Sequence, residues 1–294
     1  MGSDTIYDFL KFPHQPYPAA LANEILKHRK TPLIDRHQTP LASMGSCFAI
    51  NVARWLRERD FNYIVTEPPG ESSANWDRVF STACIRQIVQ YSFGRFHPGV
   101  RWWMLPEFKV QDPFRRNVVY PEDGAETLFE AHRKASQTAL LQSQVLILTL
   151  GLTETWRDKR DGATFYRVPS PRIYDPAIHE FHLQTVQECV NDLLTAIDLL
   201  GNRTVILTVS PQPLFATFRT DVDVLTANEE NKATLRAAAA EVARCRSSVH
   251  YFPGYELVTR VIRDPYEPDG RHVRPTTVDQ VMDLFCWMFV REPA

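Results

Sequence analysis

The amino-acid sequence predicts an α/β fold in which a parallel sheet is covered by helices on both faces. Short apolar runs alternate along the chain with segments whose apolar residues recur at spacings of three and four. Two of the runs, Val145–Leu150 and Thr204–Val209, show no alternation of apolar and polar residues, which is typical of central strands buried on both faces. Strands that alternate with helices build parallel sheets.

Five strands are expected, at residues 41–44, 63–65, 145–150, 204–209 and 249–252. Right-handed connections, with the first crossover returning across the sheet, give these strands the order 2-1-3-4-5. Helical spacing is clear after the first strand, at Phe48, Val52 and Trp55. It is also clear between Leu183 and Ile197, and a last helix is predicted over residues 278–290.

Two stretches, residues 93–121 and 157–182, are rich in Pro, Arg, Trp and Tyr, and we expect both to be irregular. The second follows the third strand, so we expect it to form a lid or wall where open parallel sheets bind ligands. The chain has no repeat, low-complexity tract or linker. It therefore predicts one domain over residues 1–294, with residues 1–38 as an N-terminal extension packed on it.

Composition and charge exclude several classes of protein. The chain has 294 residues, 44% of them hydrophobic, which is enough for a large core. A net charge of −2 gives no overall basic field, which argues against nucleic acid or an anionic membrane as the main partner. No run reaches the roughly 18 to 20 apolar residues that a membrane span needs. The N-terminus lacks a signal-peptide arrangement, so a cytoplasmic location is expected.

The cysteines predict neither disulfides nor a zinc ribbon, because their number is odd and none forms a CxxC pair. Four lie in apolar helical patterns, where a small buried side chain is expected: Cys84, Cys189, Cys245 and Cys286. Cys47 differs, since it follows the first predicted strand within the sequence Gly45-Ser46-Cys47-Phe48-Ala49. A strand that ends in a glycine turn and opens a helix exposes a nucleophile beside backbone N–H groups and the helix dipole.

Asp269 and His272 supply the groups that such a nucleophile requires. Their spacing lets a carboxylate and an imidazole share one face of a turn. Together with Cys47 they form a set of nucleophile, base and orienting acid.

The sequence resembles the GSCFA family, which is grouped with the SGNH (GDSL-like) hydrolases. Besides residues 45–49, the resemblance is carried by residues 75–78 (NWDR), 112–115 (DPFR), 150–156 (LGLTETW), 208–211 (TVSP), 251–256 (YFPGYE) and 269–272 (DGRH). It implies a flavodoxin-like, SGNH-type three-layer sandwich with a hydrolase or acyltransferase site.

Aligned on Gly45, the resemblance places Cys47 where ordinary superfamily members carry the nucleophilic serine. A shift of one residue makes Ser46 the nucleophile, and a structural cysteine near a turn is the third interpretation. His272 would then accept the nucleophile's proton, and Asp269 would fix the tautomer of His272. A loop histidine beside an N-capping aspartate is the alternative interpretation of that pair.

The expected oxyanion donors are the backbone N–H of Cys47, a group after the second strand and a side chain after the third strand. The chain departs from the superfamily here, because Gly151 is followed by Thr153 and Glu154 where the usual sequence is Gly-x-Asn-Asp. Thr153 thus replaces an asparagine amide, and Asn75 is a candidate to supply an amide instead. Glu154 either orients a substrate hydroxyl or begins a helix.

Other motifs carry less information. His179 and His182 have a spacing that a metal could use, but no third ligand is evident, so no metal site is expected. Walker and GxGxxG motifs are absent from the sequence. Trp102 and Trp103 either stack on a sugar or pack in the core.

We therefore expect an acyl-ester hydrolase or O-acyltransferase that works through a covalent acyl-enzyme, with a glycan or another hydroxylated small molecule as candidate substrate. No cofactor is expected, although a transferase would use acyl-CoA or another acyl donor. Five cations either bind its phosphates or form a solvated surface: Arg115, Arg116, Arg157, Lys159 and Arg160. The alternative is a non-catalytic binding or scaffold protein with the same fold. The oligomeric state is not predicted.

Overall fold

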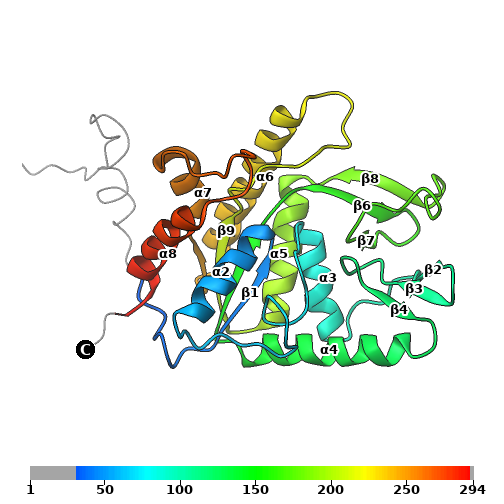
Figure 1. The fold of residues 1–294 in the computed structure, drawn as a ribbon, viewed down its shortest axis with the longest axis horizontal. Coiled ribbons are helices and arrows are strands. Elements are labelled where there is room, and N and C mark those ends of the chain that lie inside the picture. The colour runs from blue at the N-terminus through cyan, green and yellow to red at the C-terminus, as the bar shows by residue number, and fades with distance from the viewer. Residues whose placement is uncertain (1–30, 292–294) are drawn as a thin grey trace, which may run out of the picture.

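The computed structural model describes residues 31–291 and has a parallel sheet at its centre (Figure 1). Its strands are β1 (Leu41–Gly45), β5 (Val145–Leu150), β9 (Thr204–Val209) and β10 (Val249–Tyr251), in the order β1-β5-β9-β10. Gly45 is paired with Thr149, and Leu150 with Val209, so the carboxyl ends of β1, β5 and β9 lie at one edge of the sheet. The predicted α/β fold with a helix-flanked parallel sheet is confirmed.

The expectation of five parallel strands is wrong, because the chain at Tyr63 makes only one parallel bridge, to Leu41. Beyond that bridge, a side chain replaces the neighbouring strand: the Ser43 N–H donates to Ser73 Oγ at 3.1 Å. The Thr66 N–H in turn donates to the Ser73 carbonyl, at 2.8 Å. The sheet therefore has four strands, and the predicted five-stranded order is not realised.

Helices cover both faces of the sheet, and alternate side chains of β5 face the two helical layers. Val145 and Ile147 pack in one core cluster with α2 (Cys47–Glu58) and α8 (Pro275–Phe289). Leu146 and Leu148 pack in the other cluster, against helices of the opposite layer. The helices that contribute to this second cluster are α3 (Thr82–Ser92), α4 (Ala125–Gln142), α5 (Val186–Leu200) and α6 (Val224–Cys245).

The helix boundaries follow from local chemistry. Helix α8 begins at Pro275, three residues before the predicted start, because proline suits the first helical turn. Helix α5 begins with a capping box in which Thr185 and Glu188 satisfy each other's backbone N–H groups. After β10 the chain forms a short helix, α7 (Gly254–Glu256), and a π-helical turn, η2 (Leu257–Val261).

The two stretches expected to be irregular form small antiparallel sheets, which corrects the prediction of a purely parallel fold. One sheet consists of β2 (Trp103–Leu105), β3 (Lys109–Gln111) and β4 (Val119–Pro121). The other consists of β6 (Glu154–Asp158), β7 (Thr164–Phe165) and β8 (His179–Leu183), with β6 in the middle. Both lie to one side of the central sheet in Figure 1 and meet where the rings of Trp103 and Phe165 are 5.1 Å apart.

The predicted extension over residues 1–38 lies mostly outside the described residues. Its described end packs on α8, since the N–H groups of Thr31 and Leu33 donate to the carbonyls of Met288 and Phe289. Ile34 is completely buried there. Within residues 31–291, no helix has the length and apolar character required to cross a membrane.

Candidate functional site

The turn from β1 into α2 requires a glycine at position 45. Gly45 has φ +149°, and a Cβ on it would overlap the backbone of Thr149 on β5. The next N–H, that of Ser46, donates to the Thr149 carbonyl at 3.0 Å. Because β1 and β5 approach so closely here, Cys47 lies at the carboxyl edge of the sheet, where it is the first residue of α2.

Ser46 and Cys47 have different environments. Ser46 is 3% exposed and caps α2, because its Oγ accepts the Phe48 N–H at 3.3 Å. Cys47 is partly exposed and lies at the helix N-terminus, where N–H groups lack intrahelical acceptors. Its own N–H has no hydrogen-bond partner among residues 31–291. The thiol therefore lies beside a free donor and the positive end of the helix dipole.

Both residues line a cavity of about 240 Å³, which is walled mainly by apolar side chains. Its walls come from the turn before α2, the segment before α3, and the loops that follow β5, β9 and the π-helical turn. The lining residues are Ser46, Cys47, Phe80, Gly151, Leu152, Ser210, Gln212, Pro213, Leu214, Phe215, Ala216 and Arg271.

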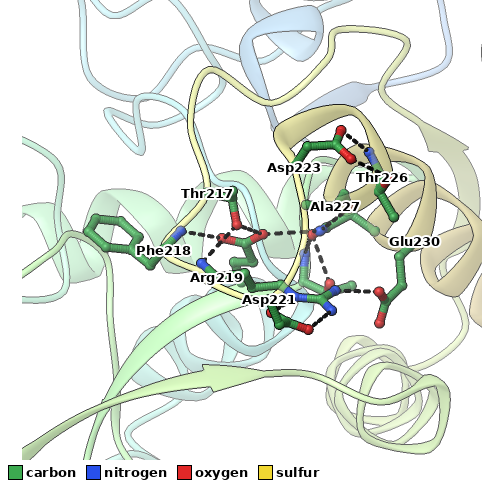
Figure 2. A network of polar contacts seen from close by, with 11 residues as sticks. Thr217, Phe218, Arg219, Asp221, Asp223, Thr226, Ala227 and Glu230 are labelled. Atoms are coloured by element: carbon green, nitrogen blue, oxygen red, sulfur yellow. Dashed lines mark hydrogen bonds and ion pairs between the residues drawn. The ribbon is translucent and has the colours of Figure 1, made fainter.

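Glu154 anchors the loop between β9 and α6, whose first half walls the cavity. Its carboxylate accepts the Thr217 hydroxyl at 2.8 Å and the Phe218 N–H at 3.2 Å. Farther along the loop, Arg219 pairs with Asp221 and with Glu230 of α6 (Figure 2). Glu154, which was predicted to orient a substrate hydroxyl, therefore fixes the position of the loop that forms one wall of the cavity.

Thr153 was expected to donate to the oxyanion in place of the usual asparagine amide, but its hydrogen bonds go to Asn231 instead. Its N–H and its hydroxyl both donate to Asn231 Oδ1, at 2.6 Å and 2.8 Å, and the residue is 1% exposed. The Gly151 N–H is also engaged, by the Phe80 carbonyl at 2.9 Å. A Cβ on Gly151 would lie 2.9 Å from that same oxygen, so glycine is required there to bring this loop against Phe80.

Asn75 does not line the cavity with Cys47. Its backbone contacts Glu67 and Arg115, and its side chain makes no hydrogen bond to any residue in the described part of the chain. Gln212, which the sequence did not single out, does line the cavity, and its amide makes no hydrogen bond to residues 31–291. Gln212 is therefore a candidate amide donor beside Cys47.

Asp269 and His272 lie together as predicted from their spacing, with Asp269 Oδ2 bonded to His272 Nδ1. The imidazole bond and the backbone N–H groups of Arg271 and His272 hold the pKa of Asp269 well below its usual range. The His272 side chain is 60% exposed. Among the described residues its ring bonds only to Asp269, and no hydrogen bond joins it to Cys47.

Arg271 connects this loop to the cavity. It lines the cavity, donates to the Pro213 carbonyl at 3.3 Å, and lies over the Phe215 ring at 5.0 Å. Since His272 is the next residue, the imidazole is carried on a segment that forms part of the cavity wall.

A buried lysine lies behind the cavity. Lys232 of α6 is 2% exposed, and its Nζ donates to the Gly151 carbonyl at 2.7 Å. Burial lowers the pKa of Lys232 to about 7, against the smaller opposing effects of Glu229 and Cys47.

The five cations proposed to bind phosphates lie outside the cavity that holds Cys47. Each has a partner within the protein. Arg115 bonds to Tyr120 and Asn75, Arg116 lies 4.0 Å from Asp77, Arg157 pairs with Glu180, Lys159 donates to Pro176 and Arg160 pairs with Asp158.

The remaining predicted candidates serve structural roles. Trp103 is buried between the two small sheets, and Trp102 packs edge-on against Tyr120. His179 accepts the Asp175 N–H at 2.9 Å, while His182 bonds to Glu188 at 2.8 Å. Residues 31–291 contain no group of three or more His, Cys, Asp or Glu side chains that could hold a metal ion.

The fold and the site define an α/β protein that carries a cysteine at a strand-to-helix turn, inside an apolar cavity at the carboxyl edge of a parallel sheet. The chain belongs to the GSCFA family, whose model matches residues 40–285. A search of curated proteins found no match to this chain.

Proposed function

We propose that this protein is an SGNH-like acyl-ester hydrolase or O-acyltransferase that forms an acyl-enzyme on Cys47. The observation that carries the proposal is the position of the thiol, at the first residue of α2 and inside the 240 Å³ cavity. The helix dipole favours the thiolate, which is the nucleophilic form of cysteine. The resemblance to SGNH hydrolases supports the reaction class.

In the proposed reaction, the Cys47 thiolate attacks the ester carbonyl and forms a tetrahedral oxyanion. The free N–H of Cys47 and the amide of Gln212 are the donors available to that oxyanion. His272, oriented by Asp269, accepts the thiol proton and then protonates the departing alcohol.

The walls of the cavity favour an apolar acyl group. A second cavity of about 150 Å³ shares three wall residues with the first, namely Phe80, Leu152 and Ala216. It is lined by the rings of Trp156, Phe165 and Phe218 among others. An acyl group attached to Cys47 would therefore lie next to a second apolar cavity.

The acceptor decides between hydrolysis and transfer, because water and a bound hydroxyl attack the same acyl-enzyme. The five candidate phosphate-binding cations are all engaged within the protein. Their engagement favours an acyl donor that lacks a nucleotide over acyl-CoA. A glycan or another hydroxylated small molecule remains the proposed acceptor or substrate.

A non-catalytic binding protein is the second candidate. Two observations favour it: the Thr153 hydroxyl is committed to Asn231, and no described hydrogen bond joins His272 to Cys47. Such a protein would bind a small apolar ligand in the same cavity without forming a covalent bond.

Intact-mass spectrometry separates the two candidates. The protein is incubated with nitrophenyl acetate, butyrate and hexanoate, and with acetyl-CoA, then quenched in acid. The proposal predicts one acyl adduct per chain from at least one ester, and no adduct in the Cys47→Ala variant. If none of the donors leaves an adduct while an apolar ester protects the protein from thermal unfolding, the binding protein is the correct interpretation.

A further inference from the structure

Arg271 is the only Lys, Arg, Asp or Glu among the described residues that line the cavity with Cys47. Within residues 31–291 its guanidinium forms no ion pair with a carboxylate. One N–H, at Nη2, donates to a neutral acceptor, the Pro213 carbonyl, at 3.3 Å. The Nε of Arg271 is buried and has no hydrogen-bond partner in the described part of the chain. Because a guanidinium has five N–H donors, the protein leaves most of this hydrogen-bonding capacity unused.

The groups around Arg271 do not balance its charge. Asp269 is the acid nearest to it in the sequence, but Asp269 Oδ2 bonds to the His272 ring. Asp269 Oδ1 accepts the backbone N–H groups of Arg271 and His272. The Phe215 ring lies 5.0 Å from the guanidinium and is 83% exposed. An exposed cation–π contact is weak compared with an ion pair to a carboxylate, so the charge of Arg271 is available to a ligand.

Arg271 lines the first cavity and is absent from the walls of the second, apolar one. An acyl group on Cys47 that extends toward the second cavity leaves the rest of the first cavity to the alcohol part of the ester. Arg271 and the amide of Gln212 are polar groups in that remaining wall. The cation is therefore placed to contact the alcohol part of the substrate.

We propose that Arg271 binds a carboxylate carried by the alcohol part of the substrate, which makes the substrate an O-acyl ester of a hydroxy acid or of an acidic sugar. The planar guanidinium matches the two oxygens of a carboxylate, which a lysine ammonium does not. This inference rests on the proposed function in treating Cys47 as the residue that is acylated. Binding of the carboxylate itself can be measured without any turnover.

The first test compares kcat/KM for three esters: 4-(butyryloxy)benzoate, its methyl ester, and monophenyl glutarate. The first carries a carboxylate on the alcohol part, the second has the same shape without the charge, and the third carries its carboxylate on the acyl part. Comparing each variant with the wild-type protein cancels the intrinsic reactivities of the esters. Arg271→Gln should lower kcat/KM for 4-(butyryloxy)benzoate at least about tenfold more than for its methyl ester, mainly through KM.

Arg274→Gln is the matched control, because Arg274 lies in the same loop, is exposed and does not line the cavity. It should change kcat/KM for the three esters by the same factor. Equal losses for all three esters in Arg271→Gln would show that Arg271 only supports the cavity wall and His272, which overturns the proposal. A loss confined to monophenyl glutarate would place the carboxylate on the acyl part and would also overturn it.

The second test measures binding by calorimetry in the Cys47→Ala protein, which cannot be acylated at position 47. The proposal predicts that 4-(butyryloxy)benzoate binds at least about tenfold more tightly than its methyl ester, and that adding Arg271→Gln removes the difference. Equal binding of the two esters to Cys47→Ala overturns the proposal, even if Arg271→Gln fails to fold. If the acid binds more tightly but the wild-type protein forms no acyl adduct, the inference about Arg271 stands and the proposed function fails.

Discussion

Gly45 is the residue on which the site geometry depends most directly. Its positive φ and its contact with Thr149 leave no room for a side chain. The same contact brings β1 and β5 together at the point where Cys47 enters α2. A side chain at position 45 would therefore displace the nucleophile as well as strain the backbone.

Gly45→Ala should lower the free energy of unfolding by about 3 kcal/mol or more, because it combines backbone strain with overpacking. Gly124→Ala is a matched control, since Gly124 also has a positive φ, +88°, but a Cβ there would meet nothing within 4 Å. That variant should lose only about 1 kcal/mol. Urea denaturation measures both, and equal losses would contradict the close-contact argument.

Ser46→Ala should lower the stability of the protein but should not prevent acyl-enzyme formation. Ser46 Oγ caps α2 through the Phe48 N–H, so its loss should lower the free energy of unfolding by about 1 kcal/mol. Acyl-enzyme formation should persist, because the thiol of Cys47 remains. Denaturation and adduct formation are measured on the same preparation, and a stable Ser46→Ala protein that forms no adduct would identify Ser46 as the nucleophile.

The sequence predicted some of these residues and not others. Cys47 could be found because a glycine, a strand end and a helix start coincide there. Lys232 could not, because a lysine in a polar stretch of helix is usually exposed, and its burial depends on the packing of α6. Gln212 and Arg271 reach the cavity only through the course of two long loops.

At the scale of elements, the loop between β9 and α6 forms one wall of the cavity and is tied to β6. Glu154 is the first residue of β6 and accepts hydrogen bonds from two consecutive residues of the loop, Thr217 and Phe218. Hydrogen bonds to a charged group contribute about 1.5 to 3 kcal/mol each. The conformation of the loop thus depends on this carboxylate.

Glu154→Gln should weaken substrate binding more than it slows the chemical step. A neutral amide holds the loop less strongly, so KM for a nitrophenyl ester should rise about three- to tenfold with a smaller change in kcat. Glu241→Gln removes a carboxylate from an exposed pair with Arg244 and should leave both constants unchanged. Equal effects of the two variants in steady-state kinetics would show that the loop anchor has no part in the site.

The central strands β5 and β9 could be predicted because short, nearly continuous apolar runs are typical of parallel strands that are buried on both faces. The strand at residues 63–65 was predicted wrongly because its neighbour's N–H is taken by the Ser73 hydroxyl, a contact that no local pattern reveals. The small sheets were missed because most of their strands are short, as in β7 with 2 residues, and because β6 pairs with β8, which lies far along the chain.

At the scale of the whole molecule, the buried charge of Lys232 opposes folding. Its pKa is about 7 in the folded protein and 10.5 as the ordinary value, so the unfolded chain binds more protons between these two pH values. Stability should therefore rise with pH across that window, and below pH 7 the full cost is present. That cost is at most about 5 kcal/mol.

Lys232→Met should accordingly be more stable than the wild-type protein at pH 6, by a few kcal/mol after the lost hydrogen bond to Gly151 is counted. The difference should shrink as pH rises from about 7 toward 10. Denaturation of both proteins at pH 6 and pH 9 tests the sign. A variant that is less stable at pH 6 would show that Lys232 stabilises the fold, contrary to this expectation.

The most direct test of the whole account is the location of the acyl group in the wild-type protein. After brief incubation with a nitrophenyl ester and an acid quench, proteolysis and tandem mass spectrometry assign the adduct to one residue. The account predicts a thioester on Cys47 that is released by neutral hydroxylamine. An adduct on Ser46, or an acyl group on exposed lysines alone with Cys47 unmodified, would contradict it.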